Sequence, residues 1–232
     1  EGDTVDLASA NYGDRQTFSL RNIKKRADAA WINYPQGVAQ ALQEAGYKLR
    51  AFQGVVTGDV PVGAGLSSSA AFEVAAMLAF SKSSKFEIER GEMARLCQAA
   101  ENRFVGVNCG IMDMYVSLFA EKNRAVFIDC TTMTHELEPL DGSRAAIVVC
   151  NSLVAHELAQ SEYNSRRAEC ESALAKLRQH MPHVQTYKDV SLSAFHAHQD
   201  LLSQTEAARV RHVVTENQRV LDSIAALRSG DL

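Results

Sequence analysis

Residues 61–70 read Pro-Val-Gly-Ala-Gly-Leu-Ser-Ser-Ser-Ala and place three successive hydroxyl side chains directly after two glycines. They follow a stretch with strand character and precede an apolar run that predicts a helix buried on most sides. The first N–H groups of a helix have no partner within the helix, and the helix dipole is positive at that end. This junction therefore predicts an anion site that favours phosphate.

Residues 61–70 do not match the sequence motif of either of two better-known phosphate-binding loops. A Walker A loop ends in Gly-Lys-Ser/Thr, but no lysine lies between Gly63 and Ala71. A dinucleotide-binding loop needs a third Gly or Ala where Ser68 stands. From the residues alone, a serine-capped helix after a tight turn explains the string as well as a phosphate site does.

The composition is that of an ordinary globular protein. Hydrophobic residues make up 46% of the 232 residues and charged residues 22%, with only 4 Pro, which excludes a disordered or collagen-like chain. The net charge is −4, and the short basic cluster Lys24-Lys25-Arg26 is followed by Asp28, so we expect no nucleic-acid partner. No apolar stretch reaches the roughly 18 residues that span a bilayer, so we expect no membrane partner.

The five cysteines are odd in number, widely spaced and contain no Cys-x-x-Cys pair. This pattern argues against a disulfide framework and a zinc site, and it predicts a reducing compartment such as the cytoplasm. We expect the cysteines to be small buried side chains. The start Glu1-Gly2-Asp3 lacks an initiator Met, which suggests an excerpt of a longer chain.

Hydrophobic periodicity predicts an α+β protein in two parts, with a boundary near Asp141-Gly142. Turn residues and alternation predict strands around residues 5–7, 18–20, 48–57, 125–129 and 145–150. Helical spacing predicts helices over residues 35–46, 67–80, 90–103, a segment after Cys109, 156–178 and 206–227.

The full string of residues 61–70 resembles the phosphate-binding motif of the GHMP kinases. Residues 100–113, Ala-Glu-Asn-Arg-Phe-Val-Gly-Val-Asn-Cys-Gly-Ile-Met-Asp, resemble the active-site stretch of the galactokinases, a branch of that family, and the resemblance is to the bacterial type. Further segments agree at residues 128–130, 161–167 and 211–217. The resemblance implies the two-domain GHMP fold, incomplete at both ends. Residues 1–141 would belong to the N-terminal ATP-binding domain, with its mixed sheet, and residues 142–232 to the C-terminal α/β sandwich.

The resemblance also implies an activity and a set of roles. A galactokinase transfers the γ-phosphoryl group of ATP to the C1 hydroxyl of galactose and uses Mg²⁺. Asp113 would stand beside that hydroxyl as the base, and residues 31–34 match an aromatic segment by the adenine pocket. The remaining implied contacts are the ATP phosphates at Gly63, Ala64, Gly65, Leu66, Ser67, Ser68 and Ser69, Mg²⁺ at Ser69 and Glu101, and galactose at Gly110, Asp113 and Tyr163.

These residue types suit the implied chemistry, although each also has an ordinary structural explanation. Mg²⁺ usually takes few protein oxygens and completes its shell with phosphate and water, so one hydroxyl and one carboxylate suffice. A carboxylate such as that of Asp113 can orient or deprotonate the attacking hydroxyl. Without the motif, however, Glu101 would be typical of a solvated charge, Asp113 of a helix cap and Tyr163 of a surface aromatic.

The sequence departs from the family in several places. It lacks the opening Gly-Glu-His-Thr-Asp-Tyr motif with its preceding arginine, and the C-terminal glycine-rich motif, so we expect this chain alone to be an inefficient kinase. Met114 stands where the family usually has Gln, and Leu153 and Ala155 replace polar residues.

Three alternatives stay open. One is a GHMP kinase for another sugar, such as N-acetylgalactosamine or an arabinose-type substrate. Another is a non-catalytic sensor of galactose and ATP, against which the Ser69-Ala70 pair argues. The third is a fragment that binds nothing. We expect a monomer whose partners are small molecules.

Overall fold

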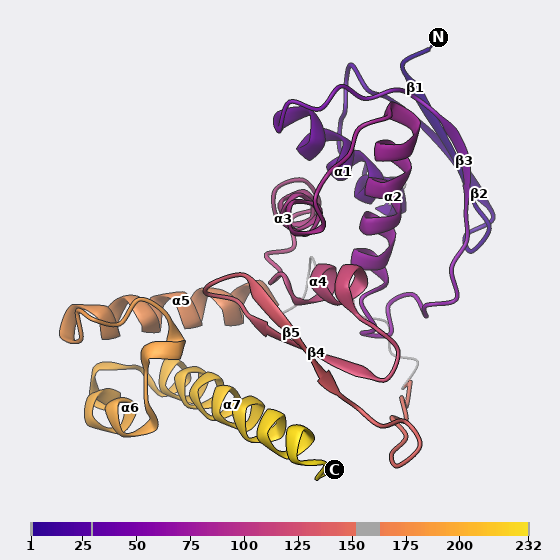
Figure 1. The fold of residues 1–232 in the computed structure, drawn as a ribbon. Helices are drawn as coiled ribbons and strands as arrows, with labels where there is room; N and C mark the ends of the chain where they lie inside the picture. The colour runs from indigo at the N-terminus through magenta and orange to yellow at the C-terminus, as the bar shows by residue number, and fades with distance from the viewer. Residues whose placement is uncertain (1, 29, 152–162, 232) are drawn as a thin grey trace. The chain divides into compact units, whose positions relative to one another are not determined.

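The computed structural model describes residues 2–28, 30–151 and 163–231, and the chain forms two compact units (Figure 1). The first unit comprises Glu1–Ala120 and Val149–Ala159, and the second comprises Glu121–Val148 and Gln160–Leu232. The division after Ala120 falls earlier than the predicted domain boundary near residue 141, which stays a prediction.

A three-stranded sheet in the order β2-β1-β3 opens the first unit. Strand β1 (Thr4–Ser9) pairs antiparallel with β2 (Asp14–Ser19) and parallel with β3 (Gln53–Val56). Val5 and Leu7 are buried while the residues between them are more exposed, so one face of the sheet is covered. Figure 1 shows helices of this unit on one side of the sheet. The alternation predicted for residues 5–7 is confirmed.

The helices of the first unit pack around α2, the helix that follows the glycine-rich loop. Val74, Met77 and Phe80 of α2 are buried among the neighbouring helices. A helix of this kind is stabilised mainly by apolar burial. The elements are η1 (Ala30–Ile32), α1 (Asn33–Glu44), α2 (Ser68–Ser84), α3 (Arg90–Ala99), the π-helix η2 (Ala100–Val105) and α4 (Met112–Phe119).

The second unit combines an antiparallel hairpin with helices. Arg228, near the end of the last helix, donates hydrogen bonds to Glu136 (2.6 Å) and Glu138 (2.9 Å) on the hairpin. The elements are β4 (Arg124–Asp129), β5 (Thr134–Pro139), α5 (Tyr163–His180), η4 (Tyr187–Asp189), α6 (Leu192–His198), η5 (Gln199–Leu201) and α7 (Gln204–Ser229). The helical core is Ala173, Leu177, Met181, Val184, Val190, Phe195, Val210 and Val214.

Two sequence predictions are wrong. Residues 145–150 form no strand, because an extended segment needs a hydrogen-bonded neighbour and none of the described strands pairs with it. Cys130 and Cys150 are exposed rather than buried. The structure also adds strand β5 and helix α6, which the periodicity did not predict, while residues 156–162 of the predicted helix lie outside the described residues.

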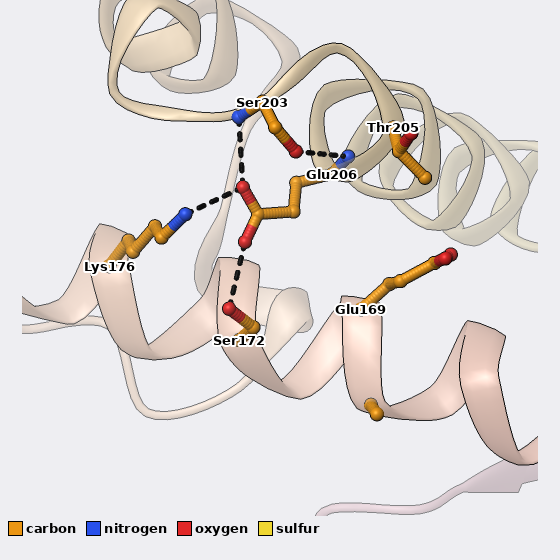
Figure 2. Close-up of a pocket in the computed structure, with 7 residues that line it drawn as sticks. Glu169, Ser172, Lys176, Ser203, Thr205 and Glu206 are labelled. Atoms are coloured by element: carbon orange, nitrogen blue, oxygen red, sulfur yellow. Dashed lines mark hydrogen bonds and ion pairs between the residues drawn. The ribbon is translucent and has the colours of Figure 1, made fainter.

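Glu206 lies at the start of α7 beside an open cavity of about 470 Å³ (Figure 2). Its carboxylate accepts hydrogen bonds from the Ser203 N–H (2.8 Å), the Ser172 hydroxyl (2.8 Å) and the Lys176 ammonium (2.7 Å). The Lys176 hydrogen bond is the largest cause that lowers the pKa of Glu206 to about 2. The main polar groups of the cavity thus pair with one another and fasten α7 to α5.

We expect Glu206→Gln to lower the free energy of unfolding at about pH 7 by about 1–3 kcal/mol, because it removes the charge from a buried hydrogen-bond network. The pKa of Glu206 falls from an ordinary 4.5 to about 2, so its stabilisation is complete above about 4.5 and is lost as the pH falls toward 2. Urea unfolding followed by circular dichroism at several pH values measures both effects. 

Glu216, whose side chain is 47% exposed on the same helix, provides the control. It pairs with Arg219 in solvent, so Glu216→Gln should change stability by less than about 1 kcal/mol. A destabilisation by Glu206→Gln that persists unchanged to about pH 2 would contradict the assignment.

Candidate active site

The glycine-rich loop reaches α2 through alternate residues with positive φ. Gly63 and Gly65 have φ of +70° and +74°, and a Cβ added to either would meet no atom within 4 Å. These glycines are therefore needed for backbone conformation and not for close packing. Ser67, the residue before α2, has a φ of 58°, and its side chain makes no capping hydrogen bond. The N–H groups at the start of α2 thus have no hydrogen bond from a Ser67 cap.

The hydroxyl of Ser69, in the first turn of α2, lies close enough to the carboxyl group of Glu101 to lower its pKa. Glu101 is only 3% exposed and accepts a hydrogen bond from the Cys109 thiol, with 3.4 Å between Sγ and Oε2. Burial raises the pKa of Glu101 and the charge of Asp113 adds to that effect, while the hydrogen bond from Cys109 and the nearby Ser69 hydroxyl oppose it. The structure therefore brings together the two predicted Mg²⁺ ligands.

Glu101 stands on a π-helix, η2, which directly continues α3. The Gly106 N–H reaches back five residues to the Glu101 carbonyl at 2.8 Å, and the Lys25 ammonium holds the Val105 carbonyl at 2.6 Å. Short π-helices inside or after α-helices are frequent at functional sites. The sequence predicts a helix over residues 90–103, but it does not predict that the end of this helix widens into a π-helix.

Asp113, the predicted base, lies in the first turn of α4, four residues after Cys109. It is close enough to raise the pKa of both Glu101 and Cys109 by charge repulsion, so it belongs to the same cluster. Gly110 has open space where a Cβ would lie, which leaves room for a ligand beside the backbone. Met114, the departure from the family, is fully buried.

The structure does not place the remaining predicted residues beside Ser69, Glu101 and Asp113. Tyr163 begins α5 in the second unit, and its contact with galactose stays a prediction. Leu153 and Ala155 lie outside the described residues.

The oxygens of Ser69 and Glu101 fit a magnesium ion. Both are hard donors, and the effect of the Ser69 hydroxyl on the pKa of Glu101 indicates that they lie near one another. In the described part of the chain, no group of three His, Cys, Asp or Glu side chains could hold a metal by itself. A cation at this place would therefore need phosphate and water to complete its shell, as Mg²⁺ commonly does.

An aromatic cluster lies one helical turn along α2 from Ser69. Phe72 contacts Trp31 and Tyr34, with ring centroids 6.2 Å and 6.4 Å away. The exposed ring of Tyr12 lies nearly parallel to Trp31, at an interplanar angle of 10° and a centroid distance of 6.3 Å. Residues 31–34, which the resemblance places by an adenine pocket, thus pack against the first turns of the helix that follows the glycine-rich loop.

Sequence reasoning missed two members of the cluster, Cys109 and Glu73. Glu73 of α2 is fully buried, and burial raises its pKa to about 10, with a further contribution from the charge of Glu101. A sequence signal existed, because Glu73 is the one acidic residue in the apolar run from Ala70 to Phe80. A buried carboxyl on an otherwise apolar helix is typical of functional sites.

Residues 33–121 match the family described as GHMP kinases N terminal domain. The chain is 44% identical over 228 residues to a galactokinase of Roseiflexus sp. (strain RS-1), and 39% identical over 228 residues to one of Chloroflexus aurantiacus. Each match covers 98% of this chain and 58% of the relative. The chain thus spans less than two thirds of the length of these curated relatives.

A solved structure is similar over almost the whole chain. The galactokinase of Lactococcus lactis, crystallised with galactose, superposes with a TM-score of 0.87 at 30% identity. The match covers 99% of this chain and 60% of that one. The predicted α+β fold of the GHMP kinases is confirmed at this level.

We expect Gly65→Ala to lower the free energy of unfolding by about 1–2 kcal/mol, because an alanine is strained at a φ of +74° although its methyl group meets no atom. The matched control is Gly58→Ala, where a Cβ also meets no atom and φ lies outside the left-handed region. Denaturant unfolding of both variants measures the difference. Equal stability of the two variants would show that the loop relaxes and imposes no such constraint.

Proposed function

We propose that the chain belongs to the GHMP kinase family and that its protein is a galactokinase; the family match of residues 33–121 and the similarity to galactokinases over nearly the whole chain support this. It transfers the γ-phosphoryl group of ATP to the C1 hydroxyl of galactose and forms galactose 1-phosphate. The observation that carries this proposal is that the Ser69 hydroxyl, at the start of a helix without a Ser67 side-chain cap, lies near the buried carboxyl group of Glu101, with Asp113 close by. None of the described helices could span a bilayer. Because the five cysteines are odd in number and widely spaced, we also propose a cytoplasmic location, and we propose that the enzyme acts as a monomer on small molecules.

The loop and the start of α2 bind the phosphates in this proposal. The N–H groups in this first turn have no acceptors within the helix and meet the negative oxygens of ATP at the positive end of its dipole. Glycine at positions 63 and 65 lets the backbone take the conformation that presents those groups. Trp31, Tyr34 and Phe72 provide apolar surface for the base.

Ser69 and Glu101 hold Mg²⁺, which neutralises charge on the phosphates when it is bound. The hydroxyl and carboxylate oxygens of these two residues suit that cation. Asp113 accepts a hydrogen bond from the C1 hydroxyl of the sugar and orients its oxygen for attack on the γ-phosphorus. Gly110 lies beside the sugar, and Tyr163 contacts it from α5.

We propose that residues 1–141 belong to the ATP-binding domain and residues 142–232 to the C-terminal domain. The match of residues 33–121 to the N-terminal family supports the first assignment. 

We expect Asp113→Asn in the full-length protein to lower kcat for galactose phosphorylation by about 10²- to 10⁴-fold, because the amide cannot accept the proton. Affinity for ADP should stay unchanged, since the base does not touch the phosphates before reaction. The measurement is ADP formation coupled to NADH oxidation, with ADP binding followed by calorimetry. Asp222→Asn, at an exposed site on α7, provides a matched control with unchanged kcat.

The same assay separates the alternatives. Turnover with galactose and none with N-acetylgalactosamine or arabinose supports the proposal. Faster turnover with another sugar would reassign the substrate within the family. Binding of galactose and ATP without turnover in the full-length protein would identify a sensor and contradict the proposed activity.

A further inference from the structure

The turn at residues 10–13, between β1 and β2, carries an exposed aromatic side chain. Tyr12 is 55% exposed, although its ring lies nearly parallel to that of Trp31, at a centroid distance of 6.3 Å. Trp31 in turn packs against Phe72 of α2, 6.2 Å away. A single exposed tyrosine needs no explanation, but this one is the outer member of a series of three rings that leads to the helix after the glycine-rich loop.

Burial decides which ring of this series can meet a ligand. Trp31 is only 8% exposed, because the Tyr12 ring stacks on it and its indole N–H donates to the Asp14 carboxylate at 3.2 Å. Its ring face becomes available only if Tyr12 moves away. Tyr12 is the most exposed ring of the series. A planar group that approaches from solvent therefore meets Tyr12 first.

Hydrogen bonds hold the turn that carries Tyr12. The Asn11 side chain donates to the Gly58 carbonyl at 2.8 Å and accepts from the Gly58 N–H at 3.0 Å. The Tyr12 N–H donates to the Ser9 hydroxyl at 3.3 Å. Gly58 stands just before Pro61, where the glycine-rich segment begins. The backbone that leads into the phosphate loop thus also fixes the position of the exposed ring.

We propose that Tyr12 is the base-stacking residue of the nucleotide site: the adenine ring of ATP lies against the exposed Tyr12 ring while the phosphates meet the start of α2. The inference rests on the proposed function, since it assumes ATP at the glycine-rich loop. Of the aromatic surface proposed for the base, Tyr12 supplies the outer ring and Trp31 the ring behind it. Aromatic side chains bind nucleobases in this way through a flat face alone.

The length of the series suits a nucleotide. Phe72 stands three residues after Ser69, about 4.5 Å along the axis of α2, so the rings begin close to the proposed phosphate site and extend away from it. Trp31 and Tyr12 continue that direction, each about one ring spacing further. A base joined to the phosphates through a ribose can therefore reach the outer ring.

The test compares Tyr12→Ala with Tyr12→Phe in the full-length protein. Tyr12→Ala removes the stacking surface, so the KM for ATP should rise and the affinity for ADP should fall by about 5- to 150-fold, the range of base–aromatic stacking. The kcat and the KM for galactose should stay unchanged, because the lost interaction is the same in the bound substrate and in the transition state. Tyr12→Phe keeps the ring face and should match the wild type. Steady-state kinetics and calorimetry measure these quantities.

Tyr47→Ala is the matched control. Tyr47 follows the end of α1 and packs against Phe86, which follows the end of α2, with ring centroids 4.5 Å apart. The variant thus removes one ring of an aromatic pair at the end of α2 opposite to Ser69. It should lower the urea midpoint and leave the KM for ATP and the affinity for ADP unchanged.

Several results would overturn the inference. Wild-type ADP affinity in Tyr12→Ala would show that the base does not lie on this ring, and an altered oligomeric state with that affinity intact would assign the ring to a contact between copies. A loss in Tyr12→Phe as large as in Tyr12→Ala would assign the effect to the hydroxyl, and a fall in kcat would indicate a distorted loop.

The wild type separates this inference from the proposed function. If the wild type neither binds ADP nor phosphorylates galactose, the proposed function fails and this inference with it. Wild-type activity together with any of the contrary results for the Tyr12 variants contradicts the inference alone.

Discussion

The start of helix α2 must stay without an internal side-chain cap if it is to receive phosphate, and the first unit is arranged around that constraint. A missing cap costs a helix about 1 kcal/mol. Burial of a large apolar side chain contributes about 1.5–3 kcal/mol, and Val74, Met77 and Phe80 are all buried. Packing along the length of α2 thus offsets the unfavourable end, and the positive φ values at Gly63, Gly65 and Ser67 bring the chain into the helix without closing it.

The need to bind phosphate at the start of α2 also explains why the carboxyl group of Glu101 lies near that end of the helix. Glu101 is held out of water on a π-helix, where burial alone would favour its neutral form. The nearby Ser69 hydroxyl and a hydrogen bond from the Cys109 thiol oppose that tendency. A positive helix end, a hydroxyl and a carboxylate thus converge from separate elements, because no single segment of sequence could present all three at one point.

Local patterns predicted much of the fold and less of the site. Alternation at Val5 and Leu7, and the apolar run after Ser69, depend on neighbours in sequence, and the structure confirms the elements that they predict. The strand predicted over residues 145–150 is wrong, because apolar composition reports suitability for a sheet and not the presence of a partner strand. Ser69 and Glu101 stand on two separate helices, so only the family resemblance could predict that they lie near one another. No periodicity could reveal that Glu73 lacks a hydrogen-bond partner.

Two buried glutamates in this chain show that hydrogen-bond partners can outweigh the effect of burial on the charge of a carboxyl. Glu206 is 6% exposed, receives hydrogen bonds from three donors and has a pKa near 2. Glu73 is 0% exposed, has none and has a pKa near 10. The first arrangement is complete within its own unit and fastens α7 to α5, so nothing need be added to it. The second has no donor for either oxygen, so nothing offsets the cost of burying a charge and burial favours its neutral form.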